Sequence, residues 1–183
     1  MNGKIKIWNE VQGCCTAKEA MQQVVTYMNA KNAYAIGVFT MEDTKEIDAE
    51  SELFVKMSMR FLHKNSKKVF LLAQNEDMLL ELGDYVEETY PKIRVMEMAN
   101  WEENAMSYDM ILNRINGAEA ECIIAAIPAE EQETFISQYR TALDAKIWLG
   151  VGTNLKKKKS KFIPCKINKF ISGIFGKKDK KAN

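Results

Sequence analysis

The sequence has little of what metal sites, disulfide frameworks and membrane-spanning segments require. Its 183 residues include one histidine, His63, and four cysteines. Cys14 and Cys15 are adjacent, and Cys122 and Cys165 stand alone, so the chain has neither a CxxC pair nor the spaced ligands of a zinc site. No apolar run approaches the roughly 18 residues that cross a bilayer, and the start MNGKIKIWNE lacks the apolar stretch of a signal peptide. These absences predict a cytoplasmic protein without a metal site.

The usual phosphate-binding glycine motifs are also missing. Neither GxGxxG nor GxxxxGK[ST] follows any strand-like segment. The glycines at 150 and 152 are too close together for a phosphate loop, and two glycines at a strand end more often mark a tight turn. The sequence therefore predicts no bound cofactor.

Charge divides the chain into two parts. Residues 154–183 contain eleven lysines, no arginine and one acid, Asp179, which gives a net charge of +10. Because the whole chain carries +1, residues 1–153 carry −9. We therefore expect an acidic domain over residues 1–153 and a separate lysine-rich tail over residues 154–183.

The first part alternates strand-like and helix-like segments. Thr16 and Glu19 have the spacing of a helix capping box, and Asn75 is placed to cap a later helix. Residues 68–73 (KVFLLA) form the continuous apolar run of a strand buried on both faces. Strict alternation predicts an α/β domain with a Rossmann-like, mostly parallel sheet and helices on both faces, followed by a C-terminal basic amphipathic helix. The expected strands cover residues 4–8, 33–39, 68–73, 92–98, 120–127 and 145–151.

Parallel sheets of this kind bind ligands at the carboxyl ends of their strands. The most distinctive loop there is residues 127–133 (IPAEEQE), where Pro128 fixes the exit from a strand. Its acids suit the start of a helix, so one interpretation is simply a well-capped helix. The other is that Gln132 and Glu133 hydrogen-bond a nucleotide. The sequence leaves both interpretations open.

Several of these segments together resemble the WecG/TagA/CpsF glycosyltransferases. The resemblance covers roughly residues 67–152 and includes the Tyr90-Pro91 pair, Pro128 with Gln132-Glu133, and the closing Gly150-Val151-Gly152 strand end. It implies transfer of an N-acetylated amino sugar from a UDP donor to a lipid-linked sugar. It also implies that Pro128, Gln132 and Glu133 bind the substrate.

Earlier in the chain, the resemblance implies catalytic residues. Thr40 matches the threonine of the family's T-x-N strand end. The family's base is an aspartate in an Asp-Gly pair, and this chain contains no such pair. Asp43 is the acid that would act as the base in its place, since general base catalysis needs a titratable group near the acceptor hydroxyl; a solvated loop acid is the alternative.

The tail has one apolar stripe flanked by lysines. Lys156, Lys157, Lys158 and Lys159 precede it, and the stripe starts at Ile163 and continues at spacings of 4, 7, 8, 11 and 12, at Ile167, Phe170, Ile171, Ile174 and Phe175. This pattern predicts binding to an anionic membrane surface, where apolar area and lysines both contribute. Packing on the chain's own domain is a second interpretation. Nucleic-acid binding fits less well, because the aromatic residues lie on the apolar face, and no nucleic-acid partner is expected.

Two functions follow from these observations. The first is a divergent glycosyltransferase, peripheral on the inner face of the cell membrane, whose partners are a UDP-sugar and a lipid-linked sugar. The second is a non-catalytic module that keeps the fold and the tail and binds a nucleotide or a partner glycosyltransferase. A homo-oligomer is left open by the sequence.

Overall fold

The structure is a computed structural model that describes residues 5–7, 14–30, 36–41, 48–104 and 107–153. Within these ranges the chain forms seven strands and six helices. The strands are β1 (Ile5–Ile7), β2 (Cys14–Cys15), β3 (Gly37–Thr40), β4 (Lys68–Ala73), β5 (Arg94–Asn100), β6 (Cys122–Ala126) and β7 (Ile147–Gly150). The helices are α1 (Ala17–Asn29), α2 (Ala49–Lys64), α3 (Glu76–Thr89), α4 (Trp101–Asn104), α5 (Tyr108–Gly117) and α6 (Ala129–Tyr139).

All seven strands belong to one sheet, in the order β2-β1-β3-β7-β6-β4-β5. The five strands from β3 to β5 in this order are parallel, and β1 and β2 add an antiparallel edge. The predicted α/β fold with a mostly parallel sheet is therefore confirmed. The two-residue strand β2 was not predicted, because a segment so short has no periodicity to detect.

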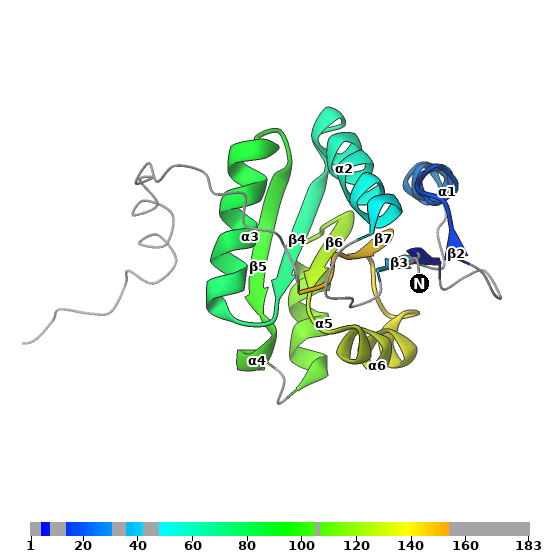
Figure 1. Cartoon of the computed structure of the whole chain (residues 1–183). Helices are drawn as coiled ribbons and strands as arrows, with labels where there is room; N and C mark the ends of the chain where they lie inside the picture. Colours follow the sequence, from blue (N-terminus) through cyan, green and yellow to red (C-terminus); the bar gives the residue numbers. More distant parts are fainter. Residues whose placement is uncertain (1–4, 8–13, 31–35, 42–47, 105–106, 154–183) are drawn as a thin grey trace, which may run out of the picture.

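The helices cover both faces of the sheet. In Figure 1, α1 and α2 lie on one side of the sheet, and α5 and α6 lie on the other. Strand β4 shows why both faces are covered: Val69 and Leu71 pack under α1, α2 and α3, whereas Phe70 and Leu72 pack over α5 and α6. The continuous apolar run of residues 68–73 is thus buried on both sides, as its composition predicts.

Local signals in the sequence place the helix starts. The Thr16 hydroxyl accepts from the Glu19 backbone, and the Glu19 carboxylate accepts from the Thr16 backbone, which completes the predicted capping box of α1. The Asn75 side chain accepts from the backbone N–H of Met78 at 3.0 Å and caps α3. These two predictions are confirmed.

Helix ends and short helices differ more from expectation. The apolar spacing of residues 104–115 predicts one helix, but the structure has α4 followed by α5. The spacing of residues 130–143 predicts another, which ends at Tyr139 in the structure. After Tyr139 the chain makes a turn in which the backbone N–H of Ala142 donates to Tyr139 at 2.8 Å, and Leu143 still packs into the core. The helical spacing of apolar residues therefore continues to Leu143, four residues beyond the end of α6, so it does not indicate where the helix ends.

The predicted tail, including its amphipathic helix, lies outside the described residues. Among the helices that the structure does describe, none combines the length and the apolar character needed to span a membrane.

Candidate functional site at the carboxyl edge of the sheet

The carboxyl ends of β4 and β6 mark the point where the chain changes direction across the sheet. These strands are neighbours, but β4 leads into α3 on one face and β6 leads into α6 on the other. Open α/β sheets bind their ligands at such a point, outside the carboxyl ends of the strands. The residues that follow β3, β4, β6 and β7 are therefore the candidates for a site.

Gln132 links two of these strand ends. Its side chain is 1% exposed. The amide Nε2 donates to the backbone carbonyl of Ile127 at 2.8 Å, and Oε1 accepts from the indole Nε1 of Trp148 at 2.9 Å. Gln132 thereby ties the loop after β6 to strand β7. We call this pair of hydrogen bonds the Gln132 bridge. Because both ends of the amide already have partners inside the protein, the bridge acts first as a support for the strand ends.

Thr40 and Gly150 lie directly beside the bridge. They are partners in the register of β3 and β7, and Thr40 is 5% exposed. A Cβ atom placed on Gly150 would clash with Oε1 of Gln132 and would come within 3.1 Å of Cγ2 of Thr40. Glycine at this position therefore lets two side chains from β3 and α6 approach each other. The structure thus brings together Thr40, Gln132 and Gly150, which the sequence placed in three separate loops.

Pro128 and Glu133 occupy the same helix start but face differently from Gln132. Pro128 is the N-cap of α6 and is partly buried. Glu133 is about half exposed, and its carboxylate Oε1 lies 2.9 Å from Nζ of Lys6 on β1. An exposed ion pair of this kind contributes little to stability, so the carboxylate can exchange partners. Asp43 and all the tail residues predicted to bind a membrane lie outside the described residues.

Gln74 was not predicted as a site residue and lies at this edge, where β4 ends beside β6. It directly follows β4, and its backbone N–H donates to Ala126 at 3.0 Å at the end of β6. Its side-chain Nε2 donates to Oε1 of Glu102 at 3.2 Å, whereas its Oε1 is buried and has no hydrogen-bond partner among the described residues. Its position one residue after the apolar run 68–73 was the signal that could have found it.

Aromatic side chains at this edge serve packing. Trp101 directly follows β5, and its place after a strand end predicts either stacking on a base or ordinary packing. It is 2% exposed, and its ring centroid lies 5.4 Å from Tyr108 and 5.6 Å from Phe135. Trp148 also stacks on Phe135, at 5.6 Å. Because both tryptophan rings are buried against other aromatic rings, the structure supports packing rather than stacking on a base.

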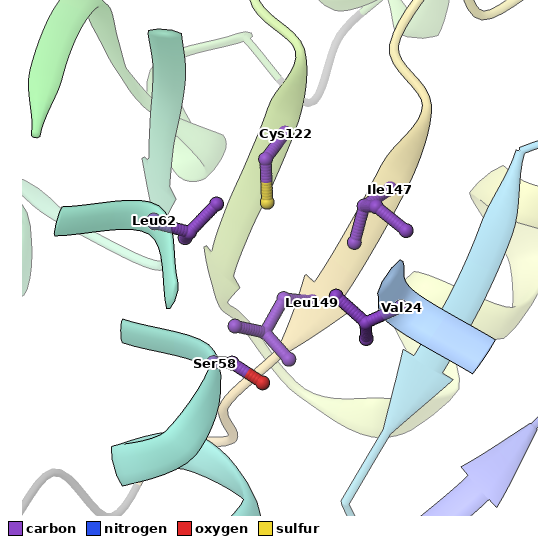
Figure 2. Close-up of a pocket in the computed structure, with 6 residues that line it drawn as sticks. All are labelled: Val24, Ser58, Leu62, Cys122, Ile147 and Leu149. Carbon is purple, nitrogen blue, oxygen red and sulfur yellow. The ribbon is translucent and has the colours of Figure 1, made fainter. Parts of the chain in front are cut away.

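A small cavity lies away from the carboxyl edge, between α1, α2 and the sheet. Figure 2 shows its lining side chains facing one another: Val24, Ser58, Leu62, Cys122, Ile147 and Leu149. Its volume of about 10 Å³ is at the limit for one water molecule and excludes a sugar. Complete burial raises the pKa of the Cys122 thiol above its ordinary value, so the sulfur stays protonated and packs as a small apolar group. We assign this cavity to imperfect packing.

Within the part of the chain that the structure describes, no three histidine, cysteine, aspartate or glutamate side chains gather as ligands for a metal ion.

Comparison with known families decides the assignment of the domain. A sequence model of the glycosyl transferase WecG/TagA/CpsF family matches residues 44–156. The chain belongs to this family. A search among curated proteins finds no match. The match runs from before α2 to beyond β7 and includes Pro128, Gln132 and Glu133, whereas Thr40 and Asp43 precede it.

Family membership gives the class of chemistry. It suggests glycosyltransferase activity, with a sugar nucleotide and an acceptor as the general classes of substrate. The Rossmann-like α/β fold and the family match agree on this assignment.

Proposed function

We propose that the protein transfers an N-acetylated amino sugar from a UDP donor to a lipid-linked acceptor at the cytoplasmic face of the membrane. The observation that carries this proposal is the coincidence of the family match with the carboxyl edge of the sheet, where Pro128, Gln132 and Glu133 lie together at the start of α6. The edge is also where a parallel sheet of this topology offers a ligand site.

In this proposal, one of these residues supports the loop after β6 and another binds the donor sugar. The Gln132 bridge holds the loop after β6 against β7, which fixes the start of α6. The N-terminus of α6, with its positive helix dipole, then faces the phosphates of a donor. Glu133, with its exchangeable ion pair, is free to accept hydrogen bonds from sugar hydroxyls.

The reaction itself needs one base. An acceptor hydroxyl attacks the anomeric carbon of the donor sugar, the bond from this carbon to the phosphate oxygen breaks, and UDP leaves. Asp43 takes the proton of the attacking hydroxyl, and Thr40 donates a hydrogen bond to the donor at the end of β3.

If the acceptor is bound to the membrane, a tail that binds lipid keeps the catalytic domain close to its substrate. We assign residues 1–153 to the catalytic domain and residues 154–183 to a segment that binds anionic lipid. Lys156, Lys157, Lys158 and Lys159 provide charge, and the stripe of Ile167, Phe170, Ile171, Ile174 and Phe175 provides apolar area.

The second candidate function is a non-catalytic module that binds a nucleotide or a partner glycosyltransferase. One observation favours it: the chain contains no Asp-Gly pair, which carries the catalytic aspartate in the resemblance described above. A module that binds a nucleotide would share the binding site with the transferase and differ from it in turnover.

Titration with UDP and UDP-N-acetyl sugars separates the two candidates. We expect saturable binding that Glu133→Gln weakens, whereas Glu88→Gln, at an exposed position near the end of α3 and away from the carboxyl edge, leaves it unchanged. A transferase also shows turnover that Asp43→Asn removes while binding remains. Binding without turnover would favour the module. The absence of any binding would contradict the transferase and would remove the nucleotide site from the module, which leaves only its binding to a partner glycosyltransferase.

A further inference from the structure

Exposed apolar side chains lie on the edge strand β5 and on the helix α3 beside it. β5 is the edge strand, and its Val95 and Met96 are 37% and 40% exposed. On α3, Leu80 is 39% exposed. The two elements touch, since a Cβ atom on Gly83 of α3 would lie 3.1 Å from Cε of Met98 on β5. We call Leu80, Val95 and Met96 the α3–β5 strip.

Carboxylates border this strip along α3. The helix contains six acids and no basic residue, and all six acids are exposed. Glu76, Asp84 and Glu87 lie at spacings that place them on the same face of the helix as Leu80. None of these three forms an ion pair with another described residue. The strip is therefore an apolar surface with uncompensated negative charge on one side.

The C-terminal segment has the complementary composition. It carries +10 in 30 residues, and its single apolar stripe is flanked by lysines on both sides. A helix over residues 163–175 would be about 20 Å long, close to the length of the 14-residue helix α3. Charge, apolar pattern and length all match the acidic strip.

The segment can also reach the strip. Residue 154 follows the end of β7 at the carboxyl edge, which is the edge where α3 begins. β5 is three strands away from β7, about 14 Å across the sheet at the usual strand spacing. Val95 lies five residues before the carboxyl end of β5, about 17 Å along the strand, so the most distant part of the strip is about 22 Å away. The nine residues 154–162 span up to about 30 Å when extended. The stripe that begins at Ile163 is therefore within reach of α3.

We propose that the C-terminal segment docks on the α3–β5 strip of its own domain, with its apolar stripe against Leu80, Val95 and Met96 and its lysines facing the carboxylates of α3. The stripe and lysines cannot contact the domain and a lipid surface at once. Docking therefore competes with membrane binding, and an anionic surface releases the segment. The strip thus regulates when the tail is available.

NMR spectra of the full chain test the docking directly. We compare the amide shifts of the wild type with those of the variant Phe170→Ser/Ile171→Ser. Intramolecular docking predicts shift differences at α3 and β5 that are the same at all protein concentrations. Spectra without differences at these elements would overturn the proposal. Differences that grow with concentration would also overturn it, because they would show that a second copy occupies the strip.

Two surface variants with matched chemistry test the competition. Leu80→Ser/Asp84→Lys changes the strip, and Leu53→Ser/Asp144→Lys makes the same replacements at exposed positions on α2 and after α6. Both variants change the net charge equally, so any general attraction to lipid is the same. On vesicles of equal parts phosphatidylglycerol and phosphatidylcholine, we expect the strip variant to bind about tenfold more tightly than the control if nine tenths of the segment is docked. Equal affinities would contradict the competition.

The spectra decide the docking whether or not the segment binds lipid, and neither test depends on sugar transfer. Failure of the proposed function and failure of this inference are therefore distinguishable.

Discussion

Two glutamines follow the neighbouring strands β6 and β4, and the protein uses them differently. Gln132 is buried, and both ends of its amide have partners at 2.8 and 2.9 Å. Gln74 is partly buried; one end of its amide donates to Glu102 at 3.2 Å, and the other end has no hydrogen-bond partner among the described residues. The same side chain is thus a structural support at one strand end and an incompletely used hydrogen-bonding group at the other.

The difference shows on which side of the carboxyl edge buried side chains tie the strand ends together. Around β3, β6 and β7, Gln132 and Thr40 lie against Gly150, so a side chain at position 150 would disturb both of them. After β4, Asn75 stabilises the local structure by capping α3. The side-chain oxygen of Gln74 accepts no hydrogen bond from the described residues. Substitutions on the two sides should therefore differ in their effect on stability.

Gln132→Leu should have the largest effect. Leucine fills a similar volume but leaves the carbonyl of Ile127 and the indole N–H of Trp148 buried without partners, and each lost partner costs about 1–3 kcal/mol. We expect a fall in the free energy of unfolding of about 3 kcal/mol, measured by urea denaturation. A fall below about 1 kcal/mol would show that water or a ligand replaces the bridge.

Gly150→Ala should be next. The added methyl group would clash with Oε1 of Gln132 and crowd Thr40, and overpacking of this kind costs about 1–3 kcal/mol. We expect a loss of about 2 kcal/mol by the same measurement. Gly117→Ala is the control, because a Cβ atom at this helical glycine meets nothing within 4 Å. This control should be neutral or slightly stabilising.

Asn75→Ala should have a moderate effect. It removes the side-chain oxygen that accepts from Met78, and the loss of an N-cap costs about 1 kcal/mol. Asn75→Asp keeps the acceptor and should keep most of the stability. If both variants unfold at the same urea concentration as the wild type, the cap does not contribute to α3.

Gln74→Met should have the smallest effect. The change loses one long hydrogen bond to Glu102 but also removes the buried oxygen without a partner, so the two terms offset. We expect the free energy of unfolding to stay within about 0.5 kcal/mol of the wild type. If Gln74→Met lowered the free energy of unfolding as much as Gln132→Leu, the two glutamines would be equally important for stability, and the proposed difference between them would be wrong.

Much of the fold was predictable because its signals are local. The capping box at Thr16, the cap at Asn75 and the apolar run 68–73 each depend on a few neighbouring residues, and the structure confirms all three. The short elements β2 and α4 were not predicted, since two to four residues carry no periodic pattern. The antiparallel direction of β1 was not predicted either, because pairing direction depends on the strand it meets.

The candidate site was predictable in its location and less so in its chemistry. The sequence indicated the loop at 127–133 and named Gln132 and Glu133, and left open whether Gln132 binds a ligand or belongs to a well-capped helix. The structure shows that its amide is bonded to Trp148, a residue 16 positions later. A hydrogen bond between residues so far apart in the chain cannot be predicted from the spacing of neighbouring residues. Gln74 was missed for the same reason, since its place at the edge follows from β4 lying beside β6.

The sequence by itself determined the alternation of strands and helices, the burial of the central strand, the family resemblance and the opposite charges of the domain and the tail. These properties depend on composition and on the spacing of nearby residues, so they are present in the sequence whatever tertiary contacts the chain forms. Only the tertiary structure decided the strand order, the joining of Thr40, Gln132 and Gly150, and the exposed strip beside the acids of α3. Each of these depends on which segments, far apart in the chain, lie side by side when both faces of the sheet are buried.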